Sequence, residues 1–264
     1  MTARGTRAKE ATVRSNNPVL NRLEETSRLE SRVVSSRDVE PMTVDDVVVR
    51  TVGLLLLTGA AAAVSWAVVP DAVWLGAALA GTAIASIVLV LVISLRGITN
   101  PVPIVGYALL QGLLLGVASR TFEQVYPGIV VQAVAGTFGV FLGMAALYRA
   151  RVIRATPRLA RLVIGTLLGI AVLSVVNLVS YLVTGRPGLA VYSVSGQVGW
   201  LPYAFSVVAI IAGAFSFILD FDLVERSVRD GRPRRFAWLS AFGLVTGLVF
   251  LYWQLLRLLS YLRR

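Results

Sequence analysis

The segment that decides the fold is residues 201–229, "LPYAFSVVAIIAGAFSFILDFDLVERSVR". Its first nineteen residues, 201–219, carry no charge. A helix needs about 20 mainly apolar residues to cross the hydrocarbon core of a membrane. The segment therefore predicts a transmembrane helix over residues 201–224. Three acidic residues stand at its end: Asp220, Asp222 and Glu225.

The whole chain has the composition of a membrane protein. Of its 264 residues, 56% are hydrophobic and 15% are charged, against about 45–50% and 25% in soluble domains. The formal net charge is +11, and Lys9 is the only lysine among the 25 basic residues. The arginines fall in short clusters between apolar stretches, with no aromatic-and-basic platform beside them. They predict orientation in a membrane and not binding to nucleic acid.

The residue types that are missing exclude several kinds of active site. The chain has no histidine and no cysteine, which excludes a Ser/His triad, a thiol nucleophile, a disulfide and a zinc-type site. An intramembrane hydrolase built from Ser193, Ser195 and the acids would lack a general base that works near neutral pH. We therefore expect no enzymatic activity and no cofactor.

Seven apolar stretches are long enough, or nearly so, to span a bilayer. They cover residues 47–69, 72–95, 104–118, 129–148, 162–183, 201–224 and 236–262, with a tight turn at Pro70 and Asp71 after the first. The fold class is therefore an all-α integral membrane protein with seven transmembrane helices over residues 45–264. Residues 1–44 are polar, carry both signs of charge and predict a cytosolic, largely disordered tail.

Charge bias predicts the orientation, because arginine is retained on the cytosolic side. The loops on the N-terminal side hold eleven arginines: Arg96, Arg149, Arg151, Arg154, Arg158, Arg161, Arg226, Arg229, Arg232, Arg234 and Arg235. The opposite loops hold two, Arg120 and Arg186. The N-terminus is therefore predicted to be cytosolic, and the three acids lie at the cytosolic end of the sixth span.

The C-terminal end conflicts with this bias. Seven spans place it outside, yet Arg257, Arg263 and Arg264 lie there. Either the bias is overridden at the last helix, or the last two apolar stretches include a re-entrant piece that returns the end of the chain to the cytosol. The ratio of eleven to two favours seven spans. Arg257 is expected to extend its long side chain to the interface.

Four pairs of glycines at i,i+4 predict close helix packing, because small residues let backbones approach in a membrane. They are Gly112/Gly116, Gly139/Gly143, Gly165/Gly169 and Gly243/Gly247. In a chain with 23 glycines some pairs arise by chance. They therefore indicate a tight bundle without indicating which helices pair.

Ionisable residues at membrane depth are costly, which makes Asp220 and Asp222 candidate functional residues. On a helix these two positions lie about 160° apart, so they should face different environments. Asp222 and Glu225 share a face, and Arg226 and Arg229 are close enough to neutralise part of their charge. Acids at a helix C-terminus oppose the macrodipole. Two interpretations remain open: the acids close the helix by pairing with arginines, or they have a function.

Uncharged polar residues inside the spans are Gln111, Gln132, Ser174, Asn177, Ser180, Thr246 and Gln254. In a dry bundle each would bond to neighbouring backbone or to another member of the set. Together with a cytosolic-side Asp they could line a narrow path for a hard cation, which takes oxygen ligands.

Four segments carry a family resemblance: "NNPVL" (16–20), "FEQVYPGIVVQAVAGTFGVF" (122–141), "AFSFILDFDLVE" (214–225) and "WLSAFGLVTGLVFLYWQLLRLLSYLRR" (238–264). In combination they resemble the bacterial branch of the transmembrane Bax inhibitor motif family. The resemblance implies a Bax-inhibitor-like bundle in which six helices surround a central last helix. It also implies a pH-sensitive calcium leak.

In characterised members, the resemblance further implies, an Asp of the sixth helix pairs with an Asp of the seventh at the cytosolic mouth. The sixth-helix position matches Asp222 by its spacing to the last helix or Asp220 by its local context. The seventh-helix acid should fall near Thr246 or Gly247, and neither ionises. Gln254 is the other strongly polar group deep in that helix, and it has no charge. A latch made of two carboxylates is therefore absent.

Two hypotheses follow. The first is a cation leak, with Ca²⁺ as the expected ion, in the bacterial cytoplasmic membrane. Its gate and pathway residues would be Asp222, Asp220, Glu225, Thr246, Gln254 and Asn177. The second is a non-conducting membrane protein that binds a membrane protease or another membrane complex through its N-terminal tail.

Overall fold

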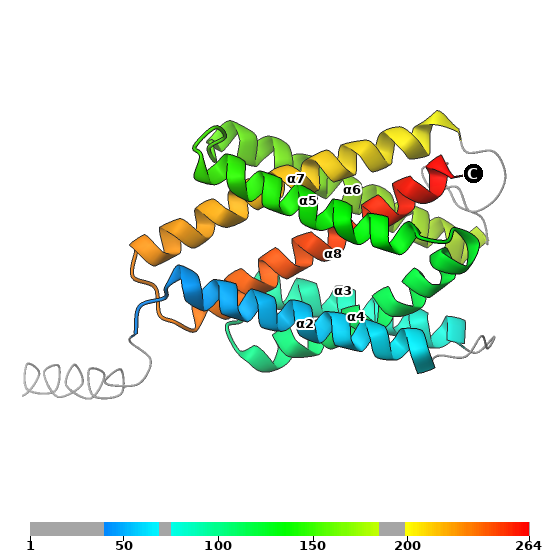
Figure 1. Cartoon of the computed structure of the whole chain (residues 1–264), viewed down its shortest axis with the longest axis horizontal. Coiled ribbons are helices and arrows are strands. Elements are labelled where there is room, and N and C mark those ends of the chain that lie inside the picture. The colour runs from blue at the N-terminus through cyan, green and yellow to red at the C-terminus, as the bar shows by residue number, and fades with distance from the viewer. Residues whose placement is uncertain (1–39, 69–74, 185–198, 264) are drawn as a thin grey trace, which may run out of the picture. The chain divides into compact units, whose positions relative to one another are not determined.

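The computed structural model describes residues 40–68, 75–184 and 199–263, and within these ranges every regular element is a helix (Figure 1). The seven helices are α2 (Val44–Val68), α3 (Leu75–Arg96), α4 (Pro101–Val125), α5 (Ile129–Arg149), α6 (Pro157–Thr184), α7 (Trp200–Arg229) and α8 (Phe236–Leu262). The predicted tail up to residue 39, the turn at Pro70 and Asp71, and Arg186, Ser193 and Ser195 lie outside the described residues.

Six of these helices are long and apolar enough to cross a membrane: α2, α4, α5, α6, α7 and α8. The seventh, α3, contributes a shorter apolar segment, Gly81–Arg96. Large hydrophobic side chains stand exposed on the outer faces, such as Leu56 at 70% and Leu95 at 83%. Water would disfavour this surface and lipid favours it. The chain is therefore a multi-pass membrane protein.

Helix α4 is longer at both ends than the predicted span 104–118. At its start the side chain of Asn100 accepts a hydrogen bond from the Val102 N–H (3.0 Å), and Pro101 follows the cap, where a missing N–H costs nothing. At its end residues 119–125, "SRTFEQV", remain helical. Gly128, with a positive φ of 81°, is the cap residue before the next helix.

Helix α7 extends to Arg229, beyond the predicted end at residue 224. The pairs Asp222–Arg226 and Glu225–Arg229 are spaced i,i+4 and stabilise this extra turn. Gly231, with a φ of 63°, then turns the chain towards α8. The acids thus lie within the helix and not at its end.

Helix α8 is the most buried of the six candidate spans, and it packs against α2, α4, α5 and α7. In Figure 1 it runs between α5 and α2. One face of α8 joins a core cluster with α2 and α4 through residues such as Val245 and Leu256. Another face joins a second cluster with α7 through residues such as Leu248 and Leu251. Helix α3 packs on α4, and α6 packs on α7.

One of the four glycine pairs and one glycine of a second pair are used for close packing. A Cβ on Gly112 or Gly116 would overlap backbone carbonyl oxygens of α2, those of Thr58 and Ala62. A Cβ on Gly247 would lie 2.9 Å from the ring of Phe217 on α7. The other two pairs, Gly139/Gly143 and Gly165/Gly169, have open space around them. The prediction of close approach therefore holds for α2–α4 and α7–α8.

The last two helices are continuous, at 30 and 27 residues, so neither contains a re-entrant piece. The start of α8 lies next to the start of α2, because Arg234 contacts Asp46. The end of α8 lies next to the α4–α5 turn, because the Arg263 guanidinium donates to the Pro127 carbonyl (2.7 Å). The beginning of α2 and the end of α8 therefore lie at opposite ends of the bundle (Figure 1).

Candidate functional site

A cavity of about 500 Å³ lies between the start of α6 and the last half of α7. Its polar lining residues are Thr156, Ser216, Asp220, Asp222 and Arg226, and aliphatic side chains of both helices form the rest. The cavity lies at the arginine-rich end of the bundle. We define this end by the last residues of α5 and α7 and the loops that follow them, with Arg149, Arg151, Arg154, Arg229, Arg232, Arg234 and Arg235. The cavity brings two of the predicted acids, Asp220 and Asp222, to one place.

The length of α7 places Asp220 at the edge of the hydrocarbon. The helix has 30 residues, or about 45 Å, which exceeds a hydrocarbon core of about 30 Å. Trp200, at its start, is 78% exposed, and exposed tryptophan is typical of a membrane interface. Asp220 lies 20 residues, or about 30 Å, further along. Asp222 and Glu225 then project into the polar region beyond.

Asp220 is a partly buried acid without a compensating partner. Among the described residues it has no ion pair and no hydrogen bond. Its neighbour on α8 is a glycine, since a Cβ built on Gly243 would lie 4.0 Å from the Asp220 Oδ1. The position opposite Asp220 is therefore Gly243, one turn before Gly247 and Thr246. Neither a cation nor a second acid of α8 faces this carboxyl group.

Asp222 and Glu225 are paired with arginines, as in one of the two interpretations that the sequence left open. The Arg226 Nε lies 2.7 Å from the Asp222 Oδ2, and the Arg229 guanidinium donates to the Glu225 Oε1 at 3.0 Å. The hydroxyl of Tyr148 on α5 also donates to the Glu225 Oε2 at 2.5 Å. With its side chain 55% exposed, Glu225 belongs to a surface network that joins α5 to α7.

Asp220 and Asp222 differ in their partners but share one cavity. The prediction that they face different environments is therefore wrong in part. The reason is that α6 leaves a space wide enough to reach both sides of α7. The macrodipole objection also weakens, because α7 continues past both acids and ends with Arg226 and Arg229 in its last turn, where positive charge is favourable.

The uncharged candidates lie away from this cavity. Thr246 lies beside the Tyr107 side chain of α4. Its Oγ1 is buried and makes no hydrogen bond of normal geometry. Gln254 is 5% exposed and its Oε1 is also unpartnered. Asn177 is 5% exposed and donates to the Leu173 carbonyl of its own helix at 3.1 Å. None of the three lines the cavity of Asp220.

An aromatic cluster separates Asp220 from the polar residues further along α8. Phe217 is fully buried, packs edge-on against Phe141 with ring centroids 5.0 Å apart, and stacks on Phe221 at 6.2 Å. Its ring also lies against Gly247. Gln254 stands seven residues, about 10 Å, beyond that glycine. The aromatic cluster therefore lies between Asp220 and Gln254.

A model of the family described as "Bax inhibitor 1 like" matches residues 6–264. The chain belongs to this family. No curated protein matches it. Membership covers nearly the whole chain and agrees with the resemblance of the four sequence segments. The described helices are therefore those of a membrane protein of the Bax inhibitor 1-like family.

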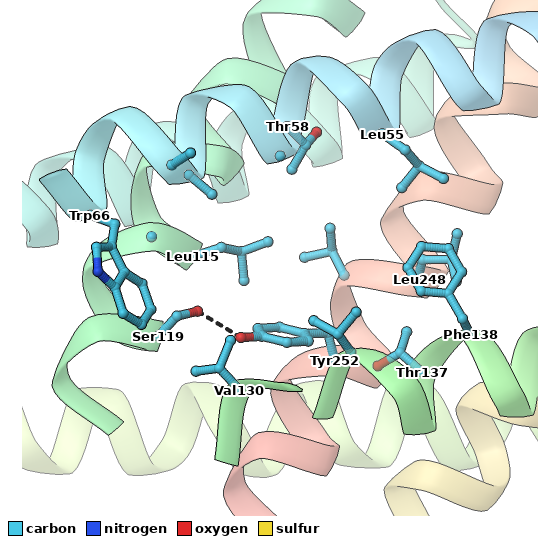
Figure 2. A pocket seen from close by; sticks show the side chains of 16 residues that line it. Leu55, Thr58, Trp66, Leu115, Ser119, Val130, Thr137, Phe138, Leu248 and Tyr252 are labelled. Carbon is cyan, nitrogen blue, oxygen red and sulfur yellow. Dashed lines mark hydrogen bonds between the residues drawn. The ribbon is translucent and has the colours of Figure 1, made fainter. Parts of the chain in front are cut away.

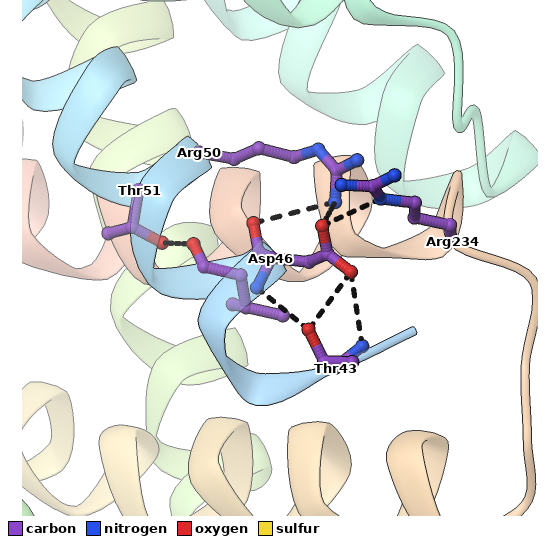
Figure 3. A network of polar contacts seen from close by, with 6 residues as sticks. Thr43, Asp46, Arg50, Thr51 and Arg234 are labelled. Atoms are coloured by element: carbon purple, nitrogen blue, oxygen red, sulfur yellow. Dashed lines mark hydrogen bonds and ion pairs between the residues drawn. The ribbon is translucent and has the colours of Figure 1, made fainter. Parts of the chain in front are cut away.

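The Bax inhibitor 1-like chain has a second acidic site that the sequence analysis missed, centred on Asp46 (Figure 3). The Arg234 Nε donates to the Asp46 Oδ1 at 2.7 Å, and the Arg50 Nη1 lies 3.7 Å from the same oxygen. Thr43 donates to the Asp46 Oδ2 through its hydroxyl (3.0 Å) and its N–H (3.3 Å). The guanidinium of Arg50 also lies over the ring of Trp238.

This network clamps the start of α2 onto the α7–α8 loop. Beside it the Met42 N–H donates to the Arg232 carbonyl at 2.8 Å, and the Met42 side chain is buried. One half of the clamp had a sequence signal, because Thr43 and Asp46 have the spacing of a helix capping box. The other half had none, because Arg234 is 188 residues away.

The described residues hold no group of three or more acidic, histidine or cysteine side chains that could bind a metal ion. A cation at Asp220 would therefore be held by one or two carboxylates, backbone carbonyls, hydroxyls and water. Ca²⁺ accepts such oxygen ligands but prefers six to eight of them. The arrangement can offer a cation a weak binding place.

Proposed function

We propose that this Bax inhibitor 1-like protein is a cation leak, with Ca²⁺ as the expected ion, and that Asp220 is its gate residue at the arginine-rich end. The observation that carries the proposal is the uncompensated Asp220 carboxyl in a cavity at the edge of the hydrocarbon. An unpaired acid at membrane depth is costly, which favours a functional reason for it. The calcium leak of related proteins supports the choice of ion.

A single acidic residue favours conduction of a cation over tight binding of it. Conduction requires a site that attracts the ion and yet releases it. Asp220 supplies charge, while Ser216 and Thr156 supply neutral oxygen atoms in the same cavity. Asp222 is already neutralised by Arg226 at 2.7 Å, so it contributes less attraction. Glu225, paired with Arg229 and Tyr148, has a structural role at the mouth.

In this proposal the aromatic cluster around Phe217 is a hydrophobic constriction that closes the path. Hydrophobic constrictions gate channels by excluding water. Movement of α7 along α8, where Gly243 and Gly247 leave little side chain between the helices, would displace Phe217. The ion would then reach the level of Gln254, with Thr246 and Asn177 as further polar groups of the bundle.

Proton uptake by Asp220 would modulate the leak. The protonated carboxyl loses the charge that attracts a cation, so flux is expected to fall as the pH falls. The two-carboxylate latch expected of the family plays no part, because Gly243 faces Asp220. The proposal places the protein in the bacterial cytoplasmic membrane as a bundle of seven spans, with α8 central because it is the most buried candidate span. The charge bias supports an orientation with the N-terminus and the arginine-rich end on the cytosolic side. No enzymatic activity is proposed.

Calcium flux into dye-loaded liposomes tests the proposal. The purified full-length protein should admit Ca²⁺ above the rate of empty vesicles, and the rate should fall with falling pH. Phe217→Ala should raise the rate, because it removes the ring that fills the constriction. Flux equal to that of empty vesicles at every pH, for both proteins, would contradict the proposal.

A second candidate function is a non-conducting protein that binds a membrane protease or another membrane complex through the N-terminal tail. The observation that favours it is the clamp at Met42, Thr43 and Asp46, which fixes the point where the chain enters α2. Co-purification with and without residues 1–40 tests this function. A truncated protein that keeps every partner would argue against it.

A further inference from the structure

A second cavity, of about 520 Å³, lies between α2, α4, α5 and α8 (Figure 2). Residues of α2, α4, α5 and α8 line it, and neither the acids nor the arginines discussed above take part. Its size falls within the range of about 300–1,000 Å³ that is usual for small-molecule sites. The proposed cation path does not use it.

The cavity is open to the side. Helices α2 and α5 flank it, and each packs on α8 without packing extensively on the other. Helices α4 and α8 contribute its floor, with Leu115 and Leu248 among the lining residues. The rim residues Gly59 on α2 and Phe138 on α5 are exposed, Phe138 at 43%. A ligand can therefore enter from the hydrocarbon and not only from water.

The lining is apolar, and its hydroxyl groups are already engaged. Thr58 donates to the Leu54 carbonyl at 2.8 Å, and Thr137 donates to the Ala133 carbonyl at 2.7 Å. Ser119 and Tyr252 share a hydrogen bond of 2.6 Å across the floor, as the dashed line in Figure 2 shows. No charged residue lines the cavity. A polar or ionic ligand would lose its hydration here without gaining partners.

The length of the cavity matches half a bilayer. Along α2 its lining extends from Leu55 to Trp66, eleven residue steps or about 16 Å. One leaflet contributes about half of a hydrocarbon core of about 30 Å. Trp66 marks one end, and the Arg120 guanidinium donates to its carbonyl at 3.2 Å. Tryptophan and arginine are typical of the headgroup level, so the groove runs from that level towards the bilayer centre.

We propose that this cavity binds one acyl chain of a phospholipid from the leaflet at the C-terminal end of α8. The chain lies between α2 and α5 on the floor of α4 and α8, and the headgroup stands at the level of Trp66 and Arg120. Apolar lining, lateral entry and the length of one leaflet together favour an acyl chain. The site does not depend on whether the protein conducts cations.

Photo-labelling in liposomes tests the site. The full-length protein is reconstituted with a trace of phosphatidylethanolamine that carries a diazirine in the middle of one acyl chain, and labelled peptides are mapped by mass spectrometry. We expect adducts to concentrate on residues 55–66 and 130–138. Adducts spread evenly over the exposed faces of α3 and α6 as well would overturn the proposal.

Two matched pairs of variants sharpen the test. Gly59→Leu fills the groove from α2, where a Cβ meets no other atom within 4 Å, and Gly53→Leu adds the same side chain on α2 outside the groove, also in open space. Val134→Trp fills the groove from α5, and Val131→Trp, at a 71% exposed position, is its control. Helix content and melting temperature confirm that each variant folds.

The expected result is loss of most of the groove labelling in Gly59→Leu and Val134→Trp, with Gly53→Leu and Val131→Trp unchanged. Equal labelling within each pair would overturn the proposal. A cross-linked dimer that disappears only in the groove-filling variants would also overturn it, because a second copy of the chain would then be the occupant. Loss of groove labelling without loss of calcium flux would separate this site from the cation path.

Discussion

Helices α2 and α6 are both apolar, and each packs against one of the last two helices, α2 against α8 and α6 against α7. The contacts that hold them in place differ greatly. Helix α2 packs on α4 and α8, with its backbone against Gly112 and Gly116, and its acid Asp46 has four polar contacts to three residues. Helix α6 packs extensively on α7 alone and leaves the cavity in which Asp220 has no partner.

This difference indicates which helices stabilise the fold and which carry the proposed function. Close packing and a satisfied acid indicate a part of the bundle that resists local opening, whereas few contacts and an unsatisfied acid indicate a part that moves or binds. We therefore assign the stability of the fold mainly to α2, α4 and α8, and the proposed leak to α6 and α7. Substitutions in the two parts should separate these properties.

The largest effect is expected at the α2–α4 contact. Gly116→Val places a branched side chain against the Ala62 carbonyl and the Ser65 hydroxyl. Overpacking of this kind costs about 1–3 kcal/mol or more, and here the obstacle is backbone. We expect loss of most folded protein, measured by size-exclusion profile and thermal melting in detergent. Gly169→Val, on the open face of α6, should behave as wild type, and a similar loss there would refute the comparison.

A smaller loss is expected when the clamp is broken. Asp46→Ala removes the carboxylate that pairs with Arg234 and accepts hydrogen bonds from the Thr43 N–H and hydroxyl in the capping box. Capping interactions at the start of a helix contribute about 0.5–2 kcal/mol, so the melting temperature should fall. The adjacent exposed Asp45 supplies the control. Should Asp45→Ala lower the melting temperature as much as Asp46→Ala, the network would have no particular role.

The hydrogen bond between Ser119 and Tyr252 joins α4 to α8 at 2.6 Å. Bonds of this kind between membrane helices contribute about 0.6 kcal/mol on average and about 1.7 kcal/mol at most. Ser119→Ala should therefore destabilise the protein slightly, in the same melting experiment. Thr121→Ala is the control, because Thr121 bonds only to the Val117 carbonyl of its own helix at 3.0 Å. Equal melting temperatures for the two variants would contradict a contribution of this bond.

The smallest effect on stability is expected at the acids of α7. Asp222→Asn weakens a partly exposed i,i+4 pair with Arg226, and such pairs contribute about 0.3–0.5 kcal/mol. Asp220→Asn removes a carboxylate without a partner and should leave the melting temperature unchanged or raise it. A clear destabilisation by Asp220→Asn would mean that this acid has a structural role after all.

Much of the fold was predictable because apolar length is a strong signal in membrane helices. Six of the seven predicted spans correspond to helices with the length and composition to cross a membrane. The ends were less predictable. The additional turn of α7 depends on the pairs of Asp222 and Glu225 with the arginines that follow. The sequence alone did not show that these pairs would keep the helix going through the polar residues after residue 224.

The site was predictable only in part. The sequence singled out Asp220 and Asp222 because acids are costly there, but it could not tell which one lacks a partner. That depends on residues from other helices, since Gly243 faces Asp220. The glycine pairs show the same limit, because Gly112/Gly116 and Gly165/Gly169 have identical spacing and opposite surroundings. Arg234, the partner of Asp46, carried no local signal.

The central claim is that Asp220, and not its paired neighbour, controls cation passage. The most direct test is the rate of Ca²⁺ entry into dye-loaded liposomes that contain equal amounts of Asp220→Asn or Asp222→Asn protein. The account predicts that Asp220→Asn falls to the rate of empty vesicles, while Asp222→Asn keeps most of the wild-type rate. Wild-type flux through Asp220→Asn would contradict it.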